Sequence, residues 1–141
     1  MFLLDTNVIS EIMRERPDPM VSAWMDEQPE EELLTASVVI AELLAGIESM
    51  VSGRKQKALR EAVEGMLAED FRGQVLTFNL PAARLYAQIL ASRRRLGRPI
   101  RELDAQIAAI ARVHSATLAT RNVEDFAHCN LVVVNPWDAN A

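Results

Sequence analysis

Short apolar runs alternate along the chain with longer stretches in which apolar residues recur every three or four positions. The runs are too short for helices and suit strands that are covered on both faces. Strands that alternate with helices predict a mainly parallel sheet with helices on both faces, joined by right-handed crossovers. The predicted strands comprise residues 1–4, 33–36, 75–78, 117–120 and 131–134.

Helices are predicted wherever the apolar spacing changes to three or four residues. Thr6 or Asn7 is the expected cap of the first helix, and Ser37 is the expected cap of the helix that runs to about residue 50. The other helices are expected over about residues 20–29, 59–67, 80–95 and 103–114. Together the elements predict a three-layer α/β/α domain whose central sheet has four to five strands.

Composition supports one globular domain over residues 1–141. The chain has 141 residues, of which 50% are hydrophobic and 25% charged, enough for one substantial core but not for two. No segment approaches the length of a membrane span, and the first strand begins at Met1 without a basic leader. We therefore expect a soluble, cytoplasmic protein with no membrane partner.

The net charge of −5 argues against a protein that coats nucleic acid through a basic surface. It does not exclude a nuclease, because a metal-dependent nuclease needs clustered carboxylates. Two basic clusters could guide RNA or an acidic partner, although charge runs are more often solvated helix faces. The clusters are Arg54, Lys55, Lys57 and Arg60, and Arg93, Arg94, Arg95, Arg98 and Arg101.

Asp5 directly follows the first predicted strand. In open α/β sheets the ligand crevice lies outside the carboxyl ends of the strands, which places Asp5 at the rim of a site. The segment Asp5-Thr6-Asn7 is equally typical of a turn and helix cap. Both interpretations of Asp5 are open at this point.

Glu42 and Asp104 are the other unusual acids. Glu42 lies among small and apolar neighbours at helical spacing, where an ionised carboxylate needs a partner unless it reaches water at the helix edge. Asp104 opens an alanine-rich helix, where an acid also serves as an N-cap or first-turn residue. Like Asp5, each falls just after a strand or near a helix start, so the fold predicts that all three gather at one rim.

Three carboxylates at one rim repel one another unless a cation binds them. A hard divalent ion with oxygen ligands is the usual solution, which favours Mg²⁺, with Mn²⁺ as the alternative. Such an ion binds a phosphodiester oxygen, activates water and stabilises charge on the leaving oxygen. Thr6 and Asn7 would then orient Asp5 or a bound water.

Other catalytic arrangements have little support. The single cysteine, Cys129, cannot form an internal disulfide and is expected to be a packing residue. His114 and His128 lack a spacing suited to zinc. There is no glycine-rich phosphate loop and no serine-hydrolase elbow.

Four segments of the chain resemble, in order, the motifs of PIN-domain proteins. The closing Asn135-Pro136-Trp137 is similar to the VapC and FitB branch of bacterial toxins. The resemblance covers essentially the whole chain. The segments are Leu4-Asp5-Thr6-Asn7, Ala41-Glu42-Leu43 with Gly46, Leu103-Asp104-Ala105-Gln106-Ile107-Ala108-Ala109, and Thr120-Arg121-Asn122-Val123-Glu124-Asp125-Phe126.

The resemblance implies a PIN-like fold and a magnesium-dependent endoribonuclease, the toxin of a type II toxin–antitoxin pair. It implies an RNA substrate, a protein antitoxin that covers the active site, a homodimer, and operator DNA bound only through the antitoxin. Carried over to this sequence, Asp5 and Asp104 match the principal metal ligands, and Glu42 matches the third acid.

The fourth acidic position departs from the family pattern. Many members have an acid soon after the fourth strand, where this chain has Asn122, with Asp125 three residues further on. Either Asp125 supplies the last carboxylate of the catalytic set, or Asn122 contributes only a neutral oxygen, which would weaken any second metal site. Asp125 is also a plausible cap or turn residue.

Two other functions fit parts of the pattern. The asparagine at an acidic position is consistent with a catalytically silent PIN-fold binding module. A magnesium phosphatase or phosphotransferase with Asp5 as nucleophile is a third hypothesis. Asp5-Thr6-Asn7 lacks the second acid, two residues on, that phosphohydrolases of the haloacid dehalogenase type carry.

Overall fold

The first strand, β1 (Phe2–Leu4), lies at the centre of the sheet, and Leu3 and Leu4 are completely buried. The computed structural model describes residues 1–141 and has five strands in the order β3-β2-β1-β4-β5, every pair parallel. This confirms the predicted α/β fold with a parallel sheet. The other strands are β2 (Leu33–Ala36), β3 (Val75–Leu76), β4 (Thr117–Ala119) and β5 (Val133–Val134).

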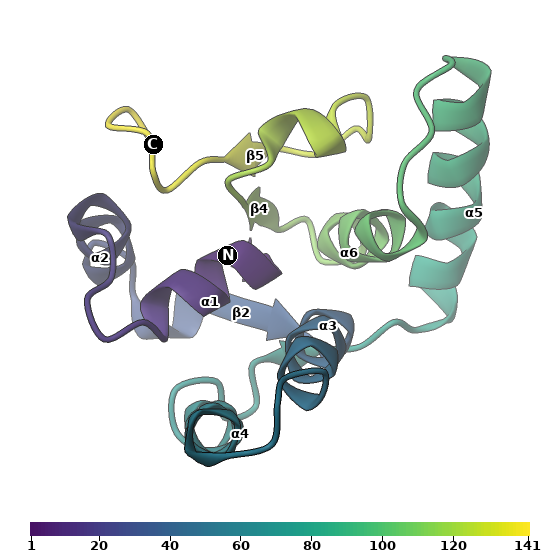
Figure 1. Cartoon of the computed structure of the whole chain (residues 1–141). Helices are drawn as coiled ribbons and strands as arrows, with labels where there is room; N and C mark the ends of the chain where they lie inside the picture. The colour runs from purple at the N-terminus through teal and green to yellow at the C-terminus, as the bar shows by residue number, and fades with distance from the viewer.

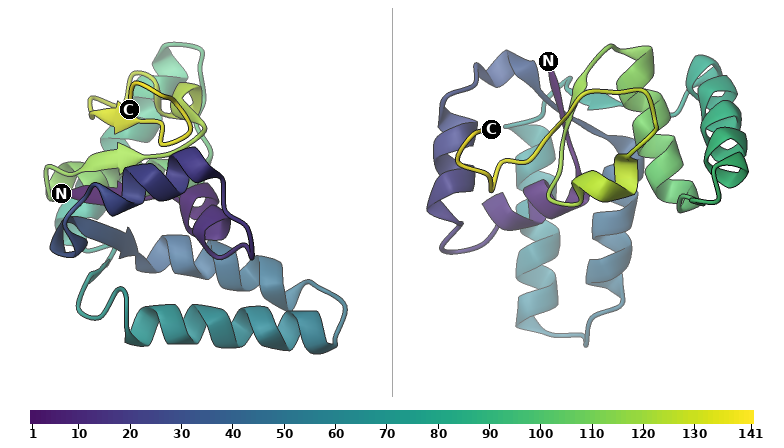
Figure 2. Two further views of the ribbon diagram at one scale, coloured as in Figure 1. Left: turned by 90° about the vertical axis from the view of Figure 1, so that its left-hand side faces the viewer. Right: turned by 90° about the horizontal axis from the view of Figure 1, so that it is seen from above.

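Helices cover both faces of this sheet. Figure 1 shows α1 and α2 beyond one face and the packed pair α5 and α6 beyond the other. Helices α3 and α4 pack as a pair that extends from the body of the domain (Figure 2). No helix combines the length and hydropathy needed to cross a bilayer. The helices are α1 (Thr6–Ile12), α2 (Pro19–Asp26), α3 (Ser37–Glu48), α4 (Arg54–Ala68), α5 (Leu80–Arg95) and α6 (Glu102–Val113), with short 3-10 helices η1 (Glu30–Glu32) and η2 (Val123–Phe126).

The core lies between the sheet and these helices. Helix α6 is buried over most of its circumference, including Ala105, Ala108 and Ala109, because small side chains let it pack against both the sheet and α5. Trp24 is nearly buried and packs edge-on against Phe2, with ring centroids 5.0 Å apart. The apolar periodicity of the sequence therefore corresponds to one continuous core.

The structure corrects two predicted caps. Neither Thr6 nor Asn7 caps α1; Asp5 does, and its carboxylate accepts a hydrogen bond from the Thr6 backbone N–H. Ser37 is the first residue of α3 rather than its cap, and Ala36 at the cap position makes no side-chain bond. In both cases the helix starts directly at the end of a strand, so the last extended residue becomes the cap.

The edge strands are shorter than predicted. β3 ends at Leu76 and β5 begins at Val133, so each edge strand has two residues. An edge strand pairs on one side only, which leaves fewer backbone hydrogen bonds to hold the extended conformation. The central strands keep nearly their predicted lengths.

Strand register determines which residues meet at the carboxyl edge of the sheet. Leu4 in β1 pairs with Ala119 in β4, and the Asp5 backbone N–H donates to the Ala119 carbonyl at 3.0 Å. The residues immediately after these strands, Asp5 and Thr120, are therefore neighbours although 115 positions separate them. This edge carries the candidate site.

Candidate active site

Asp5 is held in a fixed orientation by neutral donors. Its Oδ1 accepts from the Thr6 N–H at 2.8 Å, and its Oδ2 accepts from the Thr120 hydroxyl at 2.8 Å and more weakly from the Asn7 amide at 3.4 Å. Asp5 is therefore both the cap of α1, in place of the predicted Thr6 or Asn7, and an acid at the carboxyl edge of the sheet. Since both of its oxygens are engaged, Asp5 is poorly placed as a free nucleophile.

Thr120 connects the elements around Asp5. Its side chain is completely buried, and its hydroxyl oxygen accepts from the Asn7 amide and from the Asn122 backbone N–H, each at 3.1 Å. The Asn7 carbonyl oxygen in turn accepts from the Arg121 N–H at 3.1 Å. The structure therefore brings Asn7 and the Asn122 backbone N–H together with Thr120 around Asp5, while their role in positioning a catalytic acid stays a prediction.

Burial and the neighbouring acids destabilise the charge on Asp5. The residue is only 5% exposed, and desolvation raises its pKa above the ordinary 3.8. Hydrogen bonds from Thr120 and Thr6 act in the opposite direction, while the charges of Asp104 and Glu42 raise the pKa further. The three predicted acids thus interact electrostatically at one edge of the sheet.

Arg101 binds the other two acids. Its Nε donates to Asp104 Oδ2 at 3.0 Å, and a terminal nitrogen donates to Asp104 Oδ1 at 2.9 Å and to Glu42 Oε2 at 3.4 Å. Asp104 lies in the first turn of α6 and is not its N-cap. The N-cap residue is Arg101, whose side chain makes no capping hydrogen bond. Asp104 is buried and Glu42 half-buried, with a side chain 28% exposed.

The donor set fits a hard divalent cation by its chemistry. Asp5, Glu42 and Asp104 supply carboxylate oxygens, the ligands that Mg²⁺ and Mn²⁺ prefer. The Thr6 hydroxyl is shielded from solvent and has no hydrogen-bond partner, so a polar group is available beside Asp5. No three Asp, Glu, His or Cys side chains form a ready coordination group. Ion binding therefore requires side-chain rearrangement, and Arg101 already holds both oxygens of Asp104.

Asp125 and Asn122 differ in their relation to these acids. Asp125 lines a cavity of about 110 Å³ together with Arg101 and Asp104, whereas Asn122 does not line it. Both residues are exposed, and Asn122 precedes η2 without a side-chain cap bond. The structure thus brings Asp125 towards Asp104 and leaves the Asn122 side chain uncommitted.

Arg93 fixes the segment that carries Asp125. This residue is only 6% exposed, and its guanidinium donates to the carbonyls of Arg98, Asp125 and Ala127 at 2.6–2.9 Å. It does not belong to a solvated arginine face, which corrects its assignment to a basic surface cluster. The assignment of Arg101 to the same basic surface cluster is corrected as well, because its guanidinium pairs with Glu42 and Asp104.

Cys129 is buried and forms no disulfide, as expected for a packing residue, and burial raises the pKa of its thiol.

The histidines do not contribute to a metal group: His114 is the C-cap of α6, and His128 is exposed. Trp137 lies under the Arg121 guanidinium, 5.1 Å from the ring centroid. These residues add no second catalytic centre.

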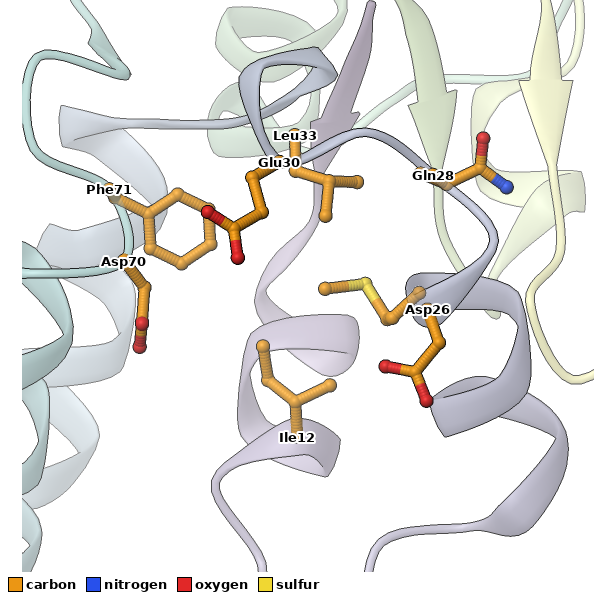
Figure 3. Close-up of a pocket in the computed structure, with 8 residues that line it drawn as sticks. Ile12, Asp26, Gln28, Glu30, Leu33, Asp70 and Phe71 are labelled. Atoms are coloured by element: carbon orange, nitrogen blue, oxygen red, sulfur yellow. The ribbon is translucent and has the colours of Figure 1, made fainter.

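The largest pocket, of about 360 Å³, is separate from the three acids, none of which lines it (Figure 3). Leu33, the first residue of β2, forms part of its wall, so the pocket is at the amino edge of the sheet. Its size therefore does not make it the catalytic centre. It is lined by Ile12, Met25, Asp26, Gln28, Glu30, Leu33, Asp70 and Phe71.

Comparison with known proteins agrees with this geometry. The family model for the PIN domain matches residues 2–129. Toxin FitB of Neisseria gonorrhoeae is 39% identical over 97% of this chain and 99% of its own length. A VapC ribonuclease of Sinorhizobium fredii, Y4jK, is 38% identical over 98% of this chain and 99% of its own length.

A solved structure shows the same fold. A chain in the structure of FitAB bound to a DNA fragment superimposes with a TM-score of 0.90 at 38% identity, covering 98% of this chain and 96% of that one. The sequence motifs, the parallel sheet with acids at its carboxyl edge, and these similarities agree. The chain belongs to the PIN-domain family.

Proposed function

We propose that the protein is a metal-dependent endoribonuclease and the toxin of a toxin–antitoxin pair. The observation that carries this proposal is that Arg101 joins Glu42 to Asp104 at the carboxyl edge of the sheet, close enough to Asp5 for the charges of these two acids to act on it. The similarity of the chain to a VapC ribonuclease and to toxin FitB supports it.

In this proposal Asp5, Glu42 and Asp104 hold Mg²⁺, or Mn²⁺ in its place. The ion would supply a Lewis acid that activates water and stabilises negative charge on the phosphodiester. Thr120 and Asn7 keep the Asp5 carboxylate in one orientation by hydrogen bonding to Oδ2. Thr6 fixes the other oxygen through its backbone N–H, and its buried hydroxyl has no hydrogen-bond partner.

The proposal includes the partners that the family resemblance implies. These are a protein antitoxin that covers the acid cluster, a homodimer, and operator DNA contacted through the antitoxin. The structure of FitAB with DNA supports this arrangement, because its similar chain was solved in a complex that binds DNA. A cytoplasmic location stays a prediction.

Removal of divalent ions tests the proposal. Purified protein should cleave RNA with Mg²⁺, lose cleavage to background with excess EDTA, and regain it when Mg²⁺ or Mn²⁺ is added back. Gel analysis of a labelled RNA measures the cleavage. The melting temperature should also rise with Mg²⁺, because a ligand of the folded state stabilises it.

The same measurements separate the alternative of a catalytically silent module. Such a module would leave RNA intact under every metal condition and would show no rise of the melting temperature with Mg²⁺. Cleavage that persists in EDTA would instead contradict the metal-dependent mechanism.

Asp125 is the proposed fourth acid, since it shares a cavity with Asp104 and Arg101. We expect Asp125→Asn to lower the rate of RNA cleavage about tenfold, because one negative group near the reacting centre is lost. Glu124→Gln, at the exposed preceding residue, is the matched control and should change the rate less than about twofold. A large loss in Asn122→Ala with none in Asp125→Asn would assign the position to Asn122.

A further inference from the structure

Arg101 is the cation nearest to the proposed metal ligands. It engages both oxygens of Asp104, at 2.9 and 3.0 Å, and one oxygen of Glu42 at 3.4 Å. The forked contact with Asp104 matches the geometry in which a guanidinium binds a carboxylate most strongly. Two of the three proposed ligands are therefore occupied by a side chain of the same protein.

This contact neutralises the acid cluster only in part. One positive charge faces Asp104 and Glu42, whereas every hydrogen-bond donor to Asp5 is neutral. Asp5 remains repelled by the other two acids, and the single guanidinium does not offset this repulsion. A divalent cation that contacts all three acids compensates their negative charge better than Arg101 does. The two cations are alternatives at Asp104, whose two oxygens cannot serve both fully.

The positions of the groups show which one can move. Asp104 is buried in the first turn of α6, but the Arg101 side chain is 66% exposed. The guanidinium can leave by side-chain rotation into water, without a change in the helix. A guanidinium stays protonated in proteins, so Arg101 leaves as a cation and not by losing its proton.

We propose that Arg101 is an internal counter-ion that competes with the divalent cation for Asp104 and Glu42 and withdraws when that cation binds. Arg101 keeps the acids together in the metal-free protein. It also raises the free metal concentration that is needed for binding, since the ion must displace the guanidinium. The inference rests on the proposed function, because that proposal assigns the ion to these acids.

Calorimetric titration with Mn²⁺ measures this competition directly. Arg101→Ala should bind Mn²⁺ about fivefold more tightly than the unsubstituted protein, because no guanidinium has to be displaced; the partly exposed contact sets this moderate size. Arg101→Gln, which keeps a long polar side chain without the charge, should behave similarly. Arg98→Ala is the matched control, since that arginine is exposed and its side chain makes no hydrogen bond or ion pair.

Thermal melting gives a second readout that does not depend on activity. Without metal, Arg101→Ala should melt below Arg98→Ala, because Asp104 and Glu42 lose their counter-ion. Saturating Mg²⁺ should close this gap, because the cation then neutralises the acids in both proteins. A purely structural role of Arg101 would leave the gap unchanged by Mg²⁺.

The outcomes separate this inference from the function on which it rests. Equal or weaker Mn²⁺ binding by both Arg101 variants would overturn the counter-ion while leaving the metal site intact. Mn²⁺ binding that is absent from the unsubstituted protein and from every variant would overturn the metal site and the inference together. Loss of binding in Asp104→Asn, with tighter binding in Arg101→Ala, supports both.

Discussion

Replacement of Asp5 by asparagine should reduce RNA cleavage by about 100-fold or more without unfolding the protein. Asparagine keeps an oxygen that can accept from the Thr6 N–H and is itself a good helix cap, so α1 should start normally. The substitution removes one carboxylate from the proposed metal ligands. Single-turnover cleavage of labelled RNA, measured beside the unsubstituted protein, gives the size of the loss.

The same variant should be close in stability to the unsubstituted protein when metal is absent, because loss of the buried charge offsets loss of the oxygen that accepts from Thr120 and Asn7. Burial raises the pKa of Asp5 above 3.8, so protonation of this carboxylate stabilises the folded state relative to the unfolded one. That stabilisation is complete below about pH 3.8 and is lost as the pH rises through the folded-state pKa. At neutral pH the charged, buried carboxylate therefore destabilises the fold, and asparagine removes that charge.

Asp18→Asn is the matched control for this variant. Asp18 caps α2 by accepting from the Met20 N–H at 2.8 Å, so the same chemical change is made at another helix start of the chain. Cleavage should be unchanged in this control. An Asp5→Asn protein that cleaves RNA at the normal rate, or one that melts well below Asp18→Asn, would contradict the assigned role.

Arg93→Ala should lower the free energy of unfolding by about 3 kcal/mol. The guanidinium donates to the carbonyls of Arg98, Asp125 and Ala127, and its removal leaves these acceptors without the donor that they share. Each lost hydrogen bond contributes about 1 kcal/mol. Urea denaturation followed by circular dichroism measures the change.

Arg94→Ala provides the comparison for Arg93. Arg94 is the exposed next residue of α5 and makes no side-chain hydrogen bond, so its loss should change stability by less than about 0.5 kcal/mol. Equal effects of the two substitutions would show that Arg93 is not a structural clamp. Lower cleavage by Arg93→Ala under folded conditions would fit its contact with the Asp125 segment.

The sequence predicted the fold well because its signal is local. Apolar runs of four residues and helical periodicity are properties of short segments, and they placed all five strands in the observed parallel sheet. The ends of the elements were less predictable. Thr6, Asn7 and Ser37 all have the chemistry of a cap, but the cap is the residue at which the extended backbone turns helical, which sequence alone did not show.

The candidate site was only partly predictable for a related reason. Asp5, Glu42 and Asp104 were identified because acids are unexpected beside apolar positions and because the motifs resemble those of a family. Thr120 and Arg101 could not be assigned in this way. Thr120 reaches Asp5 through the pairing of β1 with β4, and Arg101 looks like part of a basic run until its helix start is known.

Arg93 shows the same limit more sharply. In sequence it is the first of three consecutive arginines, a pattern that usually means a solvated face. Consecutive helical residues point in directions about 100° apart, so one of the three can turn inward while its neighbours stay in water. Which one does so depends on the packing of α5 against α6 and on the carbonyls that η2 presents.

The pairing of β1 with β4 also has a consequence for the order in which the protein becomes active during synthesis. Asp5 is made at the start of synthesis, but the hydroxyl that orients it belongs to Thr120, which is made 115 residues later. Synthesis proceeds at about 5–20 residues per second, so several seconds pass before both exist. A nascent chain therefore carries Asp5 without the hydroxyl that orients it, and the proposed active site is complete only when nearly the whole chain has been made.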